Sequence, residues 1–396
     1  MPTMTPDDTA ATGRRPAAPA DLSTQAVLEV DLDAVVANYR LLAARLGDRT
    51  VCAPAVKADA YGLGMAHVAP ALYAAGARLF FVAHLAEGLA LRALLPEAEI
   101  AVLNGLVGPE VADIHAAGLT PVLNDMGAIA LWRAEGHGRP AFVHIDTGMN
   151  RLGLDPDAAK ALIERPDLLD GIALRGWMSH MACADTPGHP LNVQQLSLFH
   201  LLLRNLPQAP GSLANSSSIF LGAPYHFEIA RPGCALYGIN PTPAAANPMR
   251  AAVRLLAPVL QVRTVSHAGT VGYGATARVE PGQRLATISI GYADGFLRCL
   301  GNGVSLALDG RPVPVVGRVS MDLVTVDVSD LPEGSVVPGA SRVEVLGETV
   351  TVDTLAAAAG TIGYEILTAL GSRFRRDYHS SEFPECASSR RSAAPS

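Results

Sequence analysis

The stretch AVKADAYGLG at residues 55–64 places a lysine at the end of an apolar run and a tyrosine four residues later. Lysine is rarely fully buried unless a partner or a reaction requires it there. A desolvated lysine loses its proton readily and then attacks carbonyl compounds and aldehydes. Lys57 is therefore either a nucleophile or an ordinary lysine whose amine reaches solvent at a strand end. These ten residues alone do not decide between the two.

Six further residues of types common in active sites lie at the ends of later apolar runs. They are Arg151 in DTGMNRLG, His180, Asn215 and Ser216 in ANSSS, and Arg231 and Gly233 in RPGCALYG. Each alone is typical of a solvated loop. Together they predict one site, provided that the runs are parallel strands whose carboxyl ends meet.

Eight short apolar runs alternate with stretches of helical periodicity in the first part of the chain. The runs cover residues 50–56, 78–83, 99–104, 120–124, 141–147, 174–180, 211–216 and 228–233. Their hydrophobicity is continuous, which is typical of parallel strands buried on both faces. Helical stretches lie between most of them, at 66–76, 86–94, 109–117, 156–164 and 193–205. The pattern predicts an α/β fold with a (β/α)8 barrel.

The chain changes in character after about residue 250. Val-rich segments separated by Gly, Pro and Asp turns follow, at 258–267, 284–290, 303–308, 312–316, 323–328 and 342–346. They predict an antiparallel β domain, with one helix near 353–359. The predicted division is a disordered tail at 1–24, the barrel at 25–250, the β domain at 251–384 and a second disordered tail at 385–396.

Composition excludes several functional classes. The chain has 396 residues, of which 49% are hydrophobic and 17% charged, so it can bury a substantial core. The net charge is −7 and no Lys- or Arg-rich block occurs, which argues against nucleic-acid binding. No apolar run could span a membrane or act as a signal peptide, so we expect a cytoplasmic protein. Five scattered cysteines without a CxxC pair predict neither disulfides nor a metal site.

The loops after strands seven and eight of such barrels commonly bind phosphate. NSSS at 215–218 and RPGCALYG supply small hydroxyls and backbone amides there. An imine-forming lysine opposite a phosphate site is what pyridoxal 5′-phosphate requires. Arg231 would face the pyridine nitrogen, where a permanent positive charge disfavours protonation of the ring. A carbanion is then stabilised only weakly, which suits quick removal and return of a proton.

The ordered motifs resemble those of the alanine racemases, fold-type III pyridoxal phosphate enzymes, over roughly residues 25–380. They are AVKADAYGLG, DTGMNRLG, SHMACAD, ANSSS, RPGCALYG, GYGAT, SIGYADGF, VGRVSMD and TIGYEILTALGSRFRR. The resemblance implies interconversion of L- and D-alanine, with D-alanine supplied for peptidoglycan or alanine directed to catabolism. It also implies a head-to-tail homodimer with shared active sites.

The resemblance further implies a role for each matching residue. Lys57 would form the imine and act on the D-face of the substrate, and Tyr273 of the partner subunit would act on the L-face. The cofactor would be bound by Lys57, Tyr61, His180, Asn215, Ser216, Arg231, Gly233, Cys234 and Tyr364. The substrate carboxylate would meet Arg151 and Met321, with Asp322 and Tyr292 at the substrate entrance.

Inversion at Cα agrees physically with two bases, because a proton must leave one face and return to the other. Lysine and tyrosine ordinarily titrate near about pH 10, so their surroundings must shift both. The cationic groups expected to do so are Arg231, acting through His180, and Arg151.

One position departs from the family pattern. Many members carry, seven residues before the arginine of DTGMNR, a lysine that becomes carbamylated and steadies that arginine; here His144 occupies the position. Histidine forms no stable carbamate of this kind, so we expect none. We expect a bound anion or a carboxamide to brace Arg151 instead. The departure bears on substrate affinity, not on the type of reaction.

Three other functions are considered. A racemase of the same fold could act more broadly, on serine or basic amino acids, although Tyr292 and Tyr364 at the entrance would restrict the pocket to small side chains. A fold-related decarboxylase is disfavoured, because that group uses a glutamate at the ring nitrogen and a cysteine near the substrate. A non-catalytic barrel that handles free cofactor is disfavoured, because that group lacks a C-terminal β domain.

Overall fold

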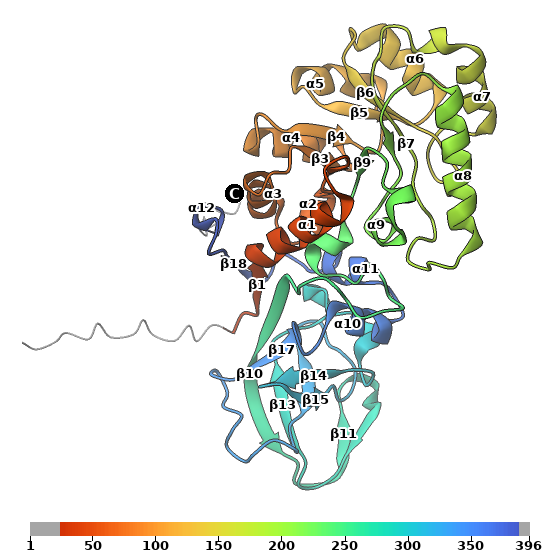
Figure 1. Cartoon of the computed structure of the whole chain (residues 1–396). Coiled ribbons are helices and arrows are strands. Elements are labelled where there is room, and N and C mark those ends of the chain that lie inside the picture. Colours follow the sequence, from red (N-terminus) through yellow and green to blue (C-terminus); the bar gives the residue numbers. More distant parts are fainter. Residues whose placement is uncertain (1–23, 388–396) are drawn as a thin grey trace, which may run out of the picture.

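The computed structural model describes residues 24–387, which form two domains joined end to end (Figure 1). The upper domain in this view contains the parallel strands and most of the helices. The lower domain is built on a mostly antiparallel sheet. The two-part architecture predicted from the sequence is confirmed.

The upper domain is the predicted parallel barrel. Its strands are β2 (Val51–Cys52), β3 (Leu79–Val82), β4 (Glu99–Val102), β5 (Thr120–Leu123), β6 (Pro140–His144), β7 (Ala173–Met178), β8 (Gly211–Ser212) and β9 (Ile229–Ala230). The six strands β3 to β8 pair in order, and β2 pairs with β9. An isolated bridge between Ala55 and Phe81 joins the β2 side to β3. The amide of Arg231 donates to the carbonyl of Ala214 at 2.8 Å and joins the β9 side to the β8 side.

Helices surround this ring of strands. They are α1 (Leu32–Leu46), α2 (Lys57–Tyr61), α3 (Met65–Ala74), α4 (Leu85–Leu94), α5 (Val111–Ala116), α6 (Met126–Glu135), α7 (Pro156–Glu164), α8 (Pro190–Asn205) and α9 (Ser218–Leu221), with single 3₁₀ turns η1 (Gly108–Glu110), η2 (Pro166–Leu169), η3 (Ala223–Tyr225) and η4 (Cys234–Tyr237). Aspartates begin three of the longer helices: Asp31, Asp125 and Asp155 each accept a hydrogen bond from the backbone amide three residues on. The five predicted helical stretches correspond to α3, α4, α5, α7 and α8; α1, α2, α6 and α9 were not predicted.

The lower domain follows the predicted β segments. Its elements are β10 (Val253–Thr264), β11 (Gly269–Val271), η5 (Tyr273–Ala275), β12 (Ala277–Val279), β13 (Arg284–Ile288), η6 (Tyr292–Asp294), η7 (Arg298–Leu300), β14 (Ser305–Leu308), β15 (Arg311–Pro314), β16 (Val324–Asp327), β17 (Arg342–Leu346), α10 (Val352–Ala359), α11 (Gly363–Thr368), β18 (Arg375–His379) and α12 (Pro384–Ala387). The main sheet has the order β15-β14-β17-β10-β1-β18, and β13 pairs with both β10 and β16. The helix expected near 353–359 is α10.

The strand β1 (Val27–Asp31) lies in this second sheet, although the sequence analysis assigned residues 25–31 to the barrel. It pairs antiparallel with β10 and parallel with β18. Val27, Leu28 and Val30 are buried, as an interior strand requires. The sequence VLEVD does not indicate which sheet the strand joins, because its partner strands lie more than two hundred residues away in the chain. Asp31 then caps α1, so the chain enters the barrel directly.

The two predicted tails fall mostly outside the described residues, which leave out 1–23 and 388–396. The second tail was predicted from residue 385, but residues 384–387 form α12. This helix is anchored because Cys386 is buried and its carbonyl accepts a 2.6 Å hydrogen bond from Nδ1 of His67. Within residues 24–387, no helix has both the length and the hydrophobicity needed to span a bilayer.

Candidate active site

Lys57 begins an unusual backbone turn. The four residues after it, 58–61, all have left-handed φ angles between 53° and 56°, although none is glycine. The left-handed conformation costs an L-residue about 1–2 kcal/mol. The turn is closed by a 2.9 Å hydrogen bond from the amide of Ala60 to the carbonyl of Val56. Lys57 and Tyr61 therefore stand at the two ends of this turn.

Contacts from other elements hold this turn in place. One carboxylate oxygen of Glu87, on α4, accepts a 2.7 Å hydrogen bond from the amide of Ala58. The other accepts a 2.7 Å bond from the amide of Ala83, at the end of β3. The carboxylate of Asp59 accepts a 2.7 Å bond from the amide of Met65, the first residue of α3. The turn is therefore fixed by tertiary contacts rather than by its own conformational preference.

Hydroxyls and backbone amides gather opposite this turn, at the start of η4. The side-chain oxygen of Ser216 accepts hydrogen bonds from the amides of Gly233, at 2.9 Å, and Ala235, at 3.3 Å. The Ser216 hydroxyl is in turn hydrogen-bonded to the thiol of Cys234. The Tyr61 hydroxyl lies so close to Gly233 that a Cβ at that position would overlap it. This group of donors suits a ligand that can only accept hydrogen bonds, such as a phosphate.

Tyr364 brings a further hydroxyl to the same place from α11. It is hydrogen-bonded to the buried thiol of Cys234, and its ring lies 6.0 Å from that of Tyr61. Burial raises the pKa of both tyrosines, which therefore stay protonated and able to donate. Tyr237 packs behind Tyr61, with the ring centroids 4.7 Å apart, and donates to the carbonyl of Ala55 at 2.8 Å.

Asn215 lies beside this group, but its side chain is engaged elsewhere. Its oxygen accepts from the amide of Ser218 at 3.0 Å and from the Ser218 hydroxyl at 2.9 Å. Its nitrogen donates to the carbonyl of Met181 at 3.3 Å. Asn215 therefore holds the α9 start against the loop after β7.

Arg231 is a buried cation between the lysine turn and the strand ends, with 5% of its surface exposed. Its guanidinium donates to the carbonyls of Ser212, at 2.8 Å, and Ser179, at 2.6 Å, and to Nδ1 of His180 at 3.2 Å. Burial lowers its pKa to about 9, which leaves it charged at neutral pH. Burial and the charge of Arg231 hold the pKa of His180 well below its usual range. The His180 ring is therefore neutral, with Nδ1 as acceptor and the proton on Nε2.

Burial also lowers the pKa of Lys57. The charge of Arg151 acts in the same direction, as does that of Arg231, while the carboxylate of Glu87 opposes them. For Lys57 both arginines act in the expected direction, although Arg231 does so directly through its charge rather than through His180. A lysine amine in these surroundings gives up its proton more readily than a free one.

Arg151 extends from the loop after β6 and is exposed. Across residues 24–387, its guanidinium has no hydrogen-bond acceptor from the chain itself. His144, the residue that departs from the family pattern, is itself bonded to a carboxamide: its Nδ1 lies 2.8 Å from Oδ1 of Asn124. Because Nδ2 of Asn124 donates to the Leu103 carbonyl at 3.1 Å, its Oδ1 is the acceptor and His144 Nδ1 carries the proton. Burial, reinforced by Arg231, lowers the His144 pKa to about 4.

The chain contains only two lysines, Lys57 and Lys160. Lys160 lies on α7, where it is exposed and forms a 3.6 Å ion pair with Glu164. No second lysine therefore stands beside the site to take the place of the carbamylated lysine.

The remaining four predicted site residues, Tyr273, Tyr292, Met321 and Asp322, lie on the surface of the lower domain. Tyr292 and Met321 are neighbours, because the amide of Tyr292 donates to the Ser320 carbonyl at 3.1 Å. Asp322 forms a 2.8 Å ion pair with Arg373. Tyr273 is 71% exposed at the start of η5.

A single chain does not bring Tyr273 to Lys57. β11, which leads into η5, lies at the end of the lower domain that is remote from the barrel (Figure 1). By contrast Tyr61, His180, Ser216, Arg231, Gly233, Cys234 and Tyr364 surround the lysine turn within one chain. A site that contains both Lys57 and Tyr273 requires a second copy.

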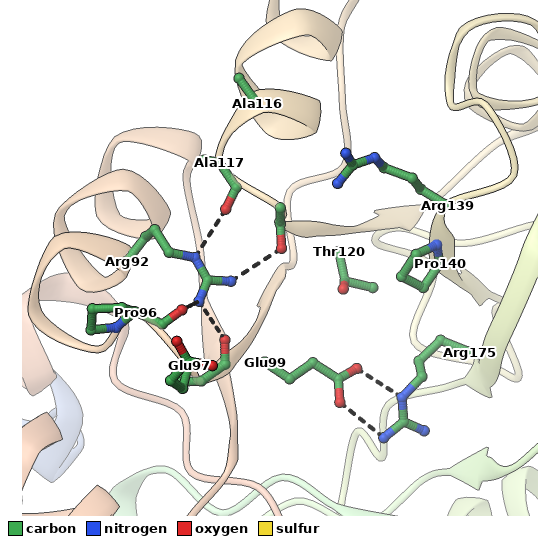
Figure 2. A pocket seen from close by; sticks show the side chains of 12 residues that line it. Arg92, Pro96, Glu97, Glu99, Ala116, Ala117, Thr120, Arg139, Pro140 and Arg175 are labelled. Atoms are coloured by element: carbon green, nitrogen blue, oxygen red, sulfur yellow. Dashed lines mark hydrogen bonds and ion pairs between the residues drawn. The ribbon is translucent and has the colours of Figure 1, made fainter.

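An open cavity with a volume of about 670 Å³ lies elsewhere (Figure 2). Glu99 and Pro140, the first residues of β4 and β6, line it, so it opens at the amino ends of the strands, opposite the candidate site. Arg92 is bound there to backbone carbonyls, including that of Ala98 at 2.7 Å. Arg175 pairs with Glu99 at 2.7 Å. The side chains of Arg92 and Arg175 are therefore already bound by other groups of the chain.

Three residues that hold the site escaped the sequence analysis: Glu87, Ser212 and Tyr237. Ser212 lies in the seventh apolar run, GSLANS, and Tyr237 lies in the motif RPGCALYG, but the hydrogen-bond partners of both are distant in the chain. Glu87 begins an ordinary amphipathic helix, where a carboxylate carries no local signal. Among the residues described, no group of three or more His, Cys, Asp or Glu side chains could hold a metal ion.

Both domains match known protein families. The family described as "Alanine racemase, N-terminal domain" matches residues 30–241, and "Alanine racemase, C-terminal domain" matches residues 252–378. An alanine racemase from Acidiphilium cryptum is 51% identical over 352 residues, which are 88% of this chain and 97% of that protein. A catabolic alanine racemase from Mesorhizobium japonicum is 49% identical over 359 residues, 89% of this chain and 93% of that one.

A solved structure shows the same fold. It is that of alanine racemase from Bartonella henselae with covalently bound pyridoxal phosphate. The TM-score is 0.86 at 38% sequence identity, and the match covers 90% of this chain and all of that one.

Proposed function

The chain belongs to the alanine racemase family, and from this premise we propose that it interconverts L- and D-alanine with pyridoxal 5′-phosphate. The observation that carries the proposal is the pairing of a partly buried lysine, Lys57, with the hydroxyls of Tyr61, Ser216 and Tyr364, which gather around Gly233 and Cys234. The donor pocket fits a phosphate, and the amine fits an aldehyde. The residues present therefore fit the cofactor.

The cofactor, when bound, makes the Cα proton of an attached amino acid acidic. The phosphate would be bound by Tyr61, Asn215, Ser216, Gly233, Cys234 and Tyr364, with Asn215 and Cys234 contributing through the backbone. Arg231 would face the ring nitrogen with its fixed positive charge, and His180, which accepts a hydrogen bond from Arg231, would lie near the ring. A positive charge there disfavours protonation of the nitrogen.

The proton transfers fall to two residues. Lys57, with a pKa lowered by burial and by Arg151, takes or returns the proton on the D-face. Tyr273 of the partner subunit serves the L-face, since it is 71% exposed and remote from its own barrel. Arg151 and Met321 would bind the substrate carboxylate, and Tyr292 and Asp322 would line the entrance.

A homodimer completes the proposal. Large apolar side chains are exposed near the candidate site residues of both domains, including Leu152 at 43%, Met321 at 53% and Ile362 at 59%. Exposed apolar surface of this kind is typical of an interface. We further propose that the barrel binds the cofactor while the lower domain supplies residues to the other barrel. The cytoplasmic setting and both metabolic roles, D-alanine for peptidoglycan or alanine catabolism, remain predictions.

The test uses the purified chain saturated with pyridoxal phosphate. Coupled oxidation of D-alanine measures racemisation of L-alanine, and chiral chromatography of an amino-acid panel separates a specific enzyme from one that also accepts serine or basic amino acids. Borohydride should attach the cofactor to Lys57 alone. Lys57→Ala should abolish activity and labelling, whereas the matched control Lys160→Ala should leave both unchanged. An active K57A protein would contradict the proposal.

A further inference from the structure

Gln195, on α8, is fully buried and lies behind two loops of the candidate site. Its oxygen accepts a 2.9 Å hydrogen bond from the amide of Ala182. Its nitrogen donates to the carbonyl of His180 at 2.8 Å and to the hydroxyl of Thr147 at 3.2 Å. A buried glutamine with every one of its three contacts to loop residues is holding those loops together rather than filling the core.

The two loops carry residues of the proposed site. Thr147 follows β6 in the segment DTGMNR, which ends at Arg151. His180 and Ala182 follow β7, and the Thr147 hydroxyl lies 2.7 Å from that of Ser179 in the same loop. The Ser179 carbonyl in turn accepts a 2.6 Å bond from Arg231. The amide of Gln195 therefore joins the Arg151 loop to the His180–Arg231 pair.

The rest of the Arg151 loop is rigid, so displacement at Thr147 would reach Arg151. The carboxylate of Asp146 accepts hydrogen bonds from the amides of Gly148, Met149 and Asn150, at 2.7–2.8 Å. Gly148 packs directly on α8: a Cβ there would lie 3.3 Å from Leu191 and 3.6 Å from Gln195. The loop thus behaves as one body that is docked on the helix at Thr147 and Gly148.

We propose that Gln195 is a positioning residue that sets the place of the Arg151 guanidinium relative to Lys57 and His180. This inference rests on the proposed function, in which Arg151 binds the substrate carboxylate. Only an amide can make all three contacts, because the site needs one acceptor and two donors. Leucine would remove them, and glutamate would keep the acceptor for Ala182 but place lone pairs against the His180 carbonyl.

The test measures binding to the cofactor-loaded protein by calorimetry with two probes. Propionate has the carboxylate of alanine without its amine, and ethylamine has the amine without the carboxylate. In Gln195→Leu and Gln195→Glu, the Kd of propionate and the KM of alanine should rise on the order of tenfold, while ethylamine binding and the visible absorbance of the cofactor stay unchanged. The neighbouring Gln194→Leu, on an exposed position of α8, is the matched control.

Thr147→Val keeps the proposal falsifiable if the Gln195 variants do not fold, because it removes the loop side of the contact, together with the Ser179 bond, and leaves Gln195 itself in place. It should weaken propionate binding and spare ethylamine in the same way. Equal weakening of both probes, or a fall in kcat with unchanged KM and propionate affinity, would overturn the proposal. An inactive wild-type protein would contradict the proposed function but would not decide the role of Gln195. Because binding of the two probes needs no turnover, the comparison of propionate with ethylamine would still test that role.

Discussion

The hydroxyl of Tyr61 occupies the space that a side chain at Gly233 would need. Tyr61 lies at the end of the left-handed turn, and Gly233 lies at the start of η4, so this contact joins the lysine turn to the donor pocket. The φ angle of Gly233 is −128°, which other residues adopt. The contact with Tyr61 therefore leaves no space for a Cβ at this position.

Gly233→Ala should therefore displace Tyr61 and weaken cofactor binding. Overpacking of this kind costs about 1–3 kcal/mol, equivalent to a roughly ten- to hundredfold rise in Kd. Absorbance titration of the cofactor-free protein with pyridoxal phosphate measures the change. Gly188→Ala is the control, because a Cβ at Gly188 meets nothing within 4 Å. Equal affinities in the two variants would show that Tyr61 does not contribute to the phosphate pocket.

Glu87→Gln should move the acidic limb of the pH–kcat profile to lower pH. The Glu87 carboxylate favours the ammonium form of Lys57, so its neutralisation lowers the lysine pKa further. The glutamine oxygen can still accept one of the two backbone bonds, so some loss of rate at the optimum accompanies the shift. Glu97→Gln, in the cavity at the amino ends of the strands, serves as the control. A limb that moves to higher pH would refute the electrostatic role of Glu87.

His144→Asn should flatten the pH dependence of stability. The folded pKa of His144 is about 4, below its ordinary value of about 6.5, so the unfolded chain binds more protons between these values. The contribution of neutral His144 to the free energy of unfolding is therefore fully present above about pH 6.5. Between about pH 6.5 and pH 4 it falls by up to about 1.4 kcal/mol for each pH unit. Asparagine can donate to Asn124 but does not titrate. Urea unfolding at neutral pH and near pH 5 should show the flattening in H144N and not in the exposed His200→Asn.

Two inactive variants should restore activity when mixed, if the sites are shared between subunits. Tyr273→Phe should bind the cofactor but not racemise, and Lys57→Ala should not racemise either. After subunit exchange, half of the dimers carry one site with both native residues, so about one quarter of the wild-type activity should return. Mixing two portions of K57A gives no recovery. Failure of the mixed pair, with exchange shown by native mass spectrometry, would place Tyr273 outside the shared site.

Local pattern was enough to predict the barrel and most of the lower sheet. Each of the eight apolar runs overlaps one of the strands β2 to β9, because continuous hydrophobicity is what burial on both faces requires. α1 was missed although an aspartate caps it, and β1 was assigned to the wrong sheet. Its correct partners, β10 and β18, are separated from it by most of the chain.

The site residues were predicted from motifs, but their geometry was not. Ala58, Asp59 and Ala60 ordinarily prefer right-handed conformations, so nothing local indicates the left-handed turn. It exists because Glu87, a residue 29 positions away, binds the Ala58 amide. Likewise the hydrogen bond between His144 and Asn124 was not predicted, since only the folded barrel brings Asn124 to that ring.

The placement of β1 between β10 and β18 has a consequence for biosynthesis. The strand leaves the ribosome with Val27, whereas its first partner begins only at Val253. The lower sheet therefore cannot close until nearly the whole polypeptide has emerged, and such distant pairing slows folding. In a ribosome-bound nascent chain, the barrel would be complete while β1 still lacked both of its partner strands, β10 and β18. A lower domain expressed from about residue 250 onward would contain β10 and β18 but would lack β1, the strand that pairs with both.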